Sequence, residues 1–136
     1  MVVEDTSMAP TLRPGDRLLV DARALRRRAP VRGEIAVVAD PNGSGRWLVK
    51  RIAAVGPSVV HVVRAGVDVR EPNDVRPPPP DAIESTLVPA GSVYLISEGT
   101  ATGRDSRSFG PVATGALIGL AWWRYAPTGR TGPISP

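Results

Sequence analysis

Short runs of β-branched and aliphatic residues, separated by glycine- and proline-containing turns, are the feature that most restricts how this chain can fold. Such runs favour extended strands, because branched side chains pack well on a pleated sheet. Pro14-Gly15 and Pro41-Asn42-Gly43 are typical of the turns that end them. The sequence therefore predicts a mostly β fold. The expected strands are Arg17–Asp21, Glu34–Ala39, Arg46–Val55, Ser58–Val63, Val93–Ser97 and Ala116–Tyr125.

A chain of 136 residues with 42% hydrophobic content has the size of one domain around one core. We expect this domain over residues 1–127. Within it, residues 71–86 should form a proline-rich excursion, because Pro77 to Pro80 cannot join a β ladder. Residues 128–136 are rich in glycine and proline, which predicts a frayed tail. Cysteine is absent, which excludes disulfides and a thiol nucleophile.

The net charge of +4 and the isoelectric point near 10.6 raise the question of an anionic partner. No aromatic residues alternate with the clustered arginines as a base-stacking surface would need, so we expect no nucleic-acid partner. The simpler interpretation of the cluster is a solvated loop, and anionic lipid headgroups at a membrane surface are the first candidate ligand. The clustered residues are Arg23, Arg26, Arg27, Arg28 and Arg32.

The longest apolar stretch, Val112 to Trp123, is too short for a membrane-spanning helix, which needs roughly 20 residues. It predicts a terminal strand instead. No basic segment followed by an apolar one precedes Ser7, so we expect the chain as given to carry neither secretory signal nor anchor. Its location in the cell stays open: membrane-associated if a natural anchor is missing, and cytoplasmic otherwise.

Lys50 is the only lysine among 17 basic residues, since all the others are arginine. Arginine keeps its proton at every accessible pH, whereas a desolvated lysine ammonium can lose one. Lys50 is therefore the one basic side chain outside the single histidine that could act as a general base.

The neighbours of Lys50 along its expected strand support this interpretation. Alternate residues of a strand share a face, so Leu48, Ile52 and Ala54 should surround Lys50 with apolar side chains while Arg51 points away. Burial on such a face would lower the pKa of the lysine toward neutrality. A strand lysine that extends its amine to water fits the same spacing, and a partner nucleophile has to decide between the two.

The candidate nucleophile is Ser7, on a turn-rich stretch that leads into the apolar run Leu18-Leu19-Val20. A loop held by a strand leaves a serine hydroxyl accessible, and the serine's own backbone N–H can point at a developing oxyanion. A loop serine is by itself most often only a turn residue, so the surrounding pattern has to carry the assignment.

That pattern resembles the signal peptidase I (S26-type) family. The family's nucleophile box is written Ser-Met-x-Pro-Thr-Leu-x-x-Gly-Asp, and residues 7–16 match it almost completely. Three further boxes follow in the family's order, and an ordered set is far more specific than any one motif. These boxes are Arg32 to Val38, Leu48 to Ile52 with Gly56, and Gly103 to Val112.

The resemblance implies a compact signal-peptidase-like β-fold of short antiparallel strands and a peptidase with a Ser7/Lys50 dyad. Its substrates would be preproteins or other leader-bearing polypeptides, cleaved after small residues, with no metal or cofactor. Met8 would line the pocket for the small side chain. Asp105 and Arg107 would pair to hold the last box beside the dyad.

The match departs from the family at two places. Many members carry a serine two positions before the nucleophile, where it contributes to the oxyanion hole, but this chain has Asp5. The Thr6 hydroxyl is then the substitute donor. The last box usually begins Gly-Asp-Asn, here Ser97-Glu98-Gly99, and carries a lysine-orienting serine where this chain has Gly103. Thr102 is the nearest substitute hydroxyl along the chain.

Three alternatives remain at this stage. The short length resembles the nickel superoxide dismutase maturation proteases, a soluble branch that removes a leader from that enzyme. A Ser-His-acid triad would have to use His61, the single histidine, which is expected to be an exposed strand residue. The third is a degenerate, non-catalytic β binding module, in which Asp5 and Gly103 mark a lost activity.

Overall fold

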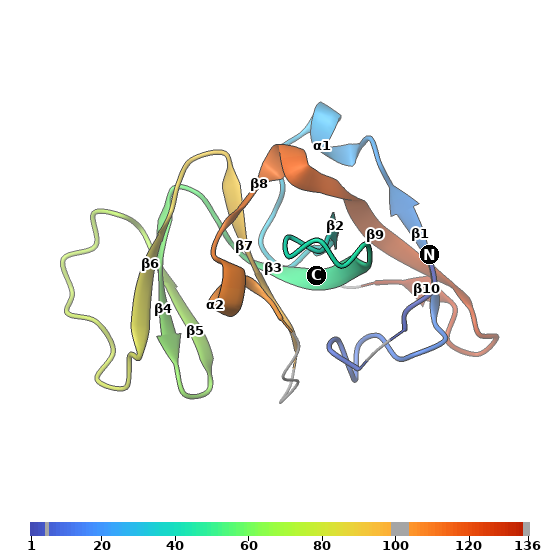
Figure 1. Cartoon of the computed structure of the whole chain (residues 1–136), viewed down its shortest axis with the longest axis horizontal. Coiled ribbons are helices and arrows are strands. Elements are labelled where there is room, and N and C mark those ends of the chain that lie inside the picture. The colour runs from blue at the N-terminus through green and yellow to red at the C-terminus, as the bar shows by residue number, and fades with distance from the viewer. Residues whose placement is uncertain (5, 99–103, 135–136) are drawn as a thin grey trace.

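The computed structural model describes residues 1–4, 6–98 and 104–134, and these form two antiparallel sheets (Figure 1). The larger sheet has the strand order β1-β9-β2-β3-β7-β8, and β10 also pairs with β9. Its strands are β1 (Arg17–Asp21), β2 (Ile35–Ala39), β3 (Trp47–Val55), β7 (Ser92–Ile96), β8 (Val112–Ala113), β9 (Leu117–Ala126) and β10 (Gly132–Pro133).

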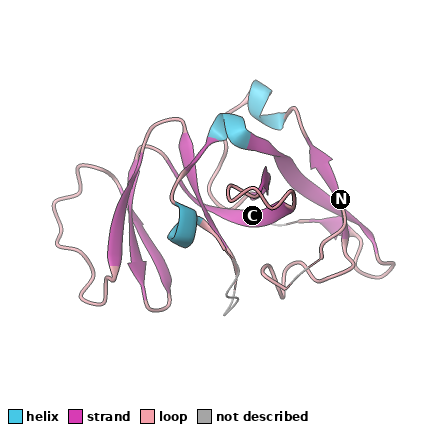
Figure 2. Ribbon diagram, in the orientation of Figure 1, coloured by secondary structure: helices cyan, strands magenta, loops and turns pink. Residues whose placement is uncertain are grey.

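The smaller sheet has the order β5-β4-β6 and stands beside the larger one. Its strands are β4 (Ser58–Val63), β5 (Gly66–Arg70) and β6 (Glu84–Val88). Figure 2 shows how little helix the described residues contain: α1 (Ala24–Arg27), α2 (Ser106–Phe109) and a 3-10 turn at Thr114–Ala116. Across the same residues, no helix has both the length and the apolar character to cross a membrane.

The predicted mostly β, antiparallel fold is confirmed, and each of the six expected strands is present within one residue at either end. β5 and β6 were not expected. Because β6 begins at Glu84, the end of the segment predicted as a proline-rich excursion over 71–86 is in fact a strand. The residues before this strand, 71–83, form turns and irregular chain.

The C-terminal residues differ from the expected frayed tail. Gly132 and Pro133 pair with Arg124 and Trp123 of β9. Ile134 donates its backbone N–H to the Trp122 carbonyl and packs against the core. Backbone pairing and one apolar contact are therefore enough to order a segment whose composition alone predicts disorder.

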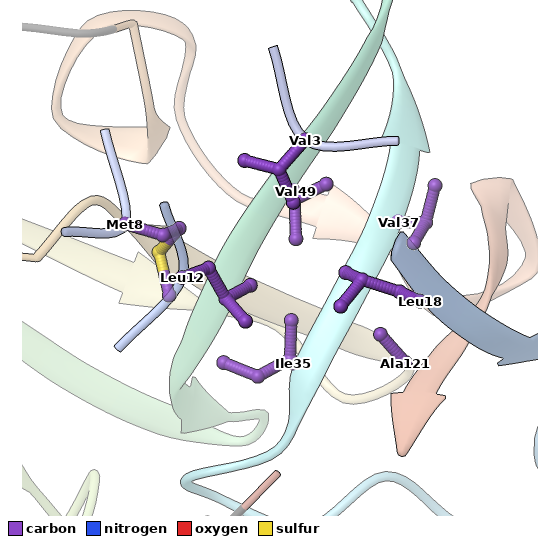
Figure 3. Close-up of a cluster of buried hydrophobic side chains, with 8 residues drawn as sticks. All are labelled: Val3, Met8, Leu12, Leu18, Ile35, Val37, Val49 and Ala121. Atoms are coloured by element: carbon purple, nitrogen blue, oxygen red, sulfur yellow. The ribbon is translucent and has the colours of Figure 1, made fainter. Parts of the chain in front are cut away.

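Three clusters of buried side chains form the core. The first joins the N-terminal segment to β1, β2 and β3, and Figure 3 shows its side chains gathered over these strands. In it, Met8 and Leu12 pack with Ile35 and Val49, which fixes the segment that carries Ser7. The second lies within the larger sheet, and the third joins the two sheets. The larger sheet therefore provides a rigid support for residues 6–16.

Candidate active site

Ser7 lies in a tight turn of the N-terminal segment and is largely buried, with 7% of its surface exposed. The turn is closed by a hydrogen bond from the Ala9 N–H to the Thr6 carbonyl (3.0 Å), and the next turn by one from the Leu12 N–H to the Met8 carbonyl (2.8 Å). Ser7 and Met8 line a cavity of about 440 Å³. The other lining residues are Met1, Val2, Val3, Glu4, Gly45, Arg46, Trp47 and Val49. Ser7 thus faces a space large enough for a few residues of an extended peptide.

Both apolar and charged side chains line this cavity. Val3, Met8 and Val49 belong to the buried core cluster. Glu4 and Arg46 form an exposed ion pair (3.3 Å) between the N-terminal segment and the start of β3. The cavity beside Ser7 therefore presents both apolar and charged groups to a molecule that enters it.

Lys50 lies near the middle of β3 and is only 2% exposed. Its Nζ donates a hydrogen bond to Ser97 Oγ (3.0 Å). The expected apolar surroundings are partly as predicted, because Leu48 and Ile52 pack together in the second cluster. Ala54 instead belongs to the third cluster, since a register irregularity between Ile52 and Ala54 turns the strand.

Ser7 and Lys50 are anchored to consecutive residues just past the end of β7. Glu98 donates its backbone N–H to the Ser7 carbonyl (2.8 Å), and Ser97 accepts from Lys50. Adjacent Cα atoms are about 3.8 Å apart, so the two predicted catalytic residues are brought to one small region of the molecule. They are separated by 43 residues in the sequence, and it is the pairing of β3 with β7 that unites them.

Arg51, next to Lys50, forms a separate ion pair with Glu98. Its guanidinium also donates to the Gly33 carbonyl (2.6 Å), two residues before β2 begins. As predicted, the Arg51 side chain contacts a carboxylate and does not share the surroundings of the Lys50 amine. The pair ties β3, β2 and the Ser97-Glu98 segment together.

Asp105 and Arg107 form the ion pair that the sequence predicts, and Asp105 also binds the backbone N–H of Ser97. The buried Asp105 carboxylate accepts from the Ser97 N–H (2.9 Å), the Arg107 N–H (2.9 Å) and Arg107 Nη2 (2.6 Å). Burial raises the pKa of Asp105, but the hydrogen bonds from Arg107 and Ser97 outweigh it and hold the pKa below its ordinary value. Asp105 is therefore a charged acceptor that also caps α2.

Ser97 is the site residue that the sequence interpretation missed. The sequence pattern places it only at a strand end and points to position 103 and its neighbour Thr102 for the hydroxyl that orients the lysine. The available signal was the serine that stands where the family's last box begins with glycine.

Asp5, Thr102 and Gly103 lie outside the described residues. Thr6 is exposed, and its carbonyl accepts from the Ala9 N–H (3.0 Å).

His61 is on a strand, as expected, but the expectation that it is exposed is wrong. It is 7% exposed on β4, and its Nδ1 lies 2.6 Å from Ser85 Oγ of β6. β4 is the central strand of the smaller sheet, so both of its edges are covered. His61 is not among the residues that line the Ser7 cavity.

Two further expectations concern ligands. In the ranges that the structure describes, no group of three or more His, Cys, Asp or Glu side chains is arranged to hold a metal ion. Within the arginine cluster, Arg27 pairs with Asp21 (2.6 Å) and Arg28 with Glu34 (2.7 Å). These pairs offset part of the positive charge that a membrane surface would meet.

Comparison with known proteins gives a consistent answer. Residues 1–126 match the family described as "Signal peptidase, peptidase S26". The mitochondrial ATP-independent inner membrane protease subunit 1b of Arabidopsis thaliana is 33% identical over 96% of this chain and 71% of its own length. The probable signal peptidase I-1 of a Synechocystis species is 28% identical over 97% of this chain and 73% of its own length.

A solved structure resembles the fold as well. The crystal structure of a signal peptidase I from Enterococcus faecalis superposes with a TM-score of 0.51 at 17% identity, covering 68% of this chain and 97% of the other. At this identity the likeness supports the fold, while the family match covers nearly all of the described residues. The mostly antiparallel β architecture, the four ordered boxes and the family match together show that this chain belongs to the signal peptidase I (peptidase S26) family.

Proposed function

We propose that the chain is a serine endopeptidase that removes leader or signal peptides after small residues, with Ser7 as nucleophile and Lys50 as general base. The observation that carries the proposal is the shared anchoring of the two residues. Lys50 Nζ binds Ser97 Oγ, and the Ser7 carbonyl binds the next residue, Glu98. A buried lysine and a serine at the wall of a peptide-sized cavity are the components that serine and lysine dyad chemistry requires.

In the proposed reaction, neutral Lys50 takes the hydroxyl proton of Ser7 while Ser7 Oγ attacks the scissile carbonyl carbon. The C–N bond then breaks, and Lys50 returns the proton to the departing amine. In the second half, Lys50 takes a proton from water, whose oxygen attacks the ester carbonyl. The ester bond breaks, Ser7 recovers its proton, and the new carboxyl end leaves.

For the oxyanion we propose the Ser7 N–H together with the Thr6 hydroxyl, because donors at this point stabilise the charge that develops on the carbonyl oxygen. Val3, Met8 and Val49 would form the wall that accepts the small side chain before the scissile bond.

The test is a pH profile of cleavage for a peptide with an Ala-x-Ala leader junction, measured on the unmodified protein, Ser7→Ala and Lys50→Arg. Lys50 works in its neutral form, so kcat/KM should rise with pH, through a single pKa well below that of a free lysine. Both variants should be folded by circular dichroism and inactive. Turnover in Lys50→Arg would contradict the dyad, because arginine cannot accept the proton.

A second measurement separates an inactive fold from an unsuitable substrate. An acylating β-lactam or penem that reports on serine and lysine dyads should add its mass to Ser7 of the unmodified protein and not to Ser7→Ala. Labelling without cleavage of the generic peptide would favour a specialised substrate, and the leader of a nickel superoxide dismutase precursor is the first to test. No labelling would favour the non-catalytic module.

A further inference from the structure

We infer that Ser97 is the positioning residue that aims the Lys50 amine for proton transfer. The inference rests on the dyad proposed above and adds a residue at a position where the family's last box usually has glycine. It starts from strand register: Arg51 of β3 pairs with Ile96 of β7, so the same antiparallel register sets Lys50 opposite Ser97. Cross-strand partners share a face, and the hydrogen bond from Nζ to Oγ (3.0 Å) follows from that.

Burial limits the other hydrogen-bond partners that could compete with Ser97 for the Lys50 amine. Ser97 is 5% exposed and Lys50 is 2% exposed, so bulk water does not compete freely for the amine. A lysine amine on a flexible side chain has three equivalent donor directions, and a fixed acceptor selects one of them. With one N–H held by Ser97, the remaining directions of the nitrogen, including the lone pair of the neutral form, become fixed as well.

Ser97 is itself held rigidly. Its backbone N–H donates to Asp105 Oδ2 (2.9 Å), and Arg107 holds that carboxylate. The acceptor for Lys50 is therefore backed by a buried, charge-assisted network rather than by a mobile side chain. Such backing is what turns an ordinary hydroxyl into an orienting group.

The residue next to Ser97 sets the position of the nucleophile. The Glu98 N–H holds the Ser7 carbonyl, and the Glu98 carboxylate is held by Arg51. Two consecutive residues thus fix the base through a side chain and the nucleophile segment through the backbone. Loss of the Ser97 hydroxyl would release only the base, which makes its effect separable from that of the segment.

The decisive variants are Ser97→Ala, which removes the hydroxyl, and Ser97→Thr, which keeps it. We expect Ser97→Ala to lower kcat on the order of 10- to 100-fold with KM within about twofold, because misplaced reacting groups cost that much. The rising limb of the pH profile should also move to lower pH, since an acceptor that stabilises the ammonium form is gone. Ser97→Thr should keep most of the activity.

Ser58→Ala is the matched control, because Ser58 is equally buried and its hydroxyl has no hydrogen-bond partner within the described part of the chain. It should leave kcat and the pH limb unchanged. If Ser97→Ala melts early, Ser97→Thr against Ser97→Val tests the same hydroxyl in side chains of nearly equal shape, and the Val variant should show the loss.

The outcomes separate this inference from the proposed function. Normal kcat and an unmoved pH limb in Ser97→Ala, with Lys50→Arg inactive, would overturn the role of Ser97 and leave the dyad intact. A fall in kcat with an unmoved limb would mean a merely structural effect and would also overturn it. Activity in Lys50→Arg would instead remove the dyad itself.

Discussion

The protonation of the Asp105 carboxylate should affect protein stability, because this carboxylate lies in the candidate site and is held in its charged form. It is buried, and its pKa is held below the ordinary value of 3.8 by Arg107 and by the Ser97 N–H. A carboxyl whose pKa is lower folded than unfolded stabilises the protein above its unfolded pKa, where it is charged in both states. That stabilisation is lost as the pH falls through the folded pKa.

We therefore predict that Asp105→Asn lowers the free energy of unfolding by about 1.5–3 kcal/mol at pH 7, the size of a hydrogen bond to a charged group. The difference from the unmodified protein should shrink once the pH falls below about 3.8. Urea unfolding from pH 7 down to pH 3 measures it. Asp81→Asn, at an exposed position of the proline-rich excursion, is the control and should change stability by less than about 0.5 kcal/mol. If Asp105→Asn lowers the free energy of unfolding by the same amount at every pH, the link between Asp105 titration and stability is contradicted.

At this scale the sequence indicates which residue could act as a base, and it does not give that residue's contacts. A lone lysine among arginines makes Lys50 the candidate base, because only one of the two residue types can lose its proton. The partner of that lysine, Ser97, depends on which residue of β7 faces β3, and this is set by strand register. Register follows from packing over the whole sheet, so the linear pattern did not point to Ser97; the Thr102 that it suggested lies outside the described residues.

At the scale of elements, the turn from β3 to β4 is where the two sheets meet. Gly56 donates its N–H to the Ser92 carbonyl (2.8 Å), and a Cβ built on it would lie 1.7 Å from the Pro89 carbonyl oxygen. No real Cβ contact is that short, and the obstacle is backbone, which cannot move aside cheaply. Glycine at position 56 is therefore required by close approach of the chain.

Gly56→Ala should lower the free energy of unfolding by at least about 2–3 kcal/mol, because an inserted methyl forces the backbone apart. The control is Gly115→Ala, where the same methyl would meet nothing within 4 Å. It should stay within about 0.5 kcal/mol of the unmodified protein. Chemical denaturation of both variants makes the comparison, and equal effects would contradict a close approach at Gly56.

The strands that sequence patterns miss are those with polar or short runs. β6 begins Glu84-Ser85-Thr86, which lacks the apolar alternation of the strands that were expected, and only Val88 is fully buried. The sequence does not predict that β5 and β6 flank β4, and so it does not reveal that Ser85 of β6 lies beside a buried His61. Central position in a sheet is a tertiary property, and a six-residue run cannot encode it alone.

At the scale of the whole molecule, the sheet order brings both ends of the chain to the nucleophile segment. β1, which follows that segment, pairs with β9, the last long strand. The buried Asp16 carboxylate lies at this junction and accepts from the Arg13 N–H (2.9 Å), Arg124 (3.3 Å) and Arg130 (3.0 Å). One carboxylate thus connects the end of the nucleophile segment, β9 and the C-terminal residues.

Arg130→Gln tests whether this junction orders the nucleophile segment. The change removes one charged partner of a buried carboxylate, so the midpoint of urea unfolding should move to a lower urea concentration. Amide hydrogen exchange of residues 12–16 should accelerate, because Asp16 also holds the Arg13 N–H. Arg76→Gln is the matched control: Arg76 pairs with Asp74 (2.6 Å) but is 69% exposed, and exposed pairs contribute little. Equal stability losses in the two variants, or unchanged exchange at residues 12–16 in Arg130→Gln, would mean that the C-terminal residues contribute nothing to the order of the segment that carries Ser7.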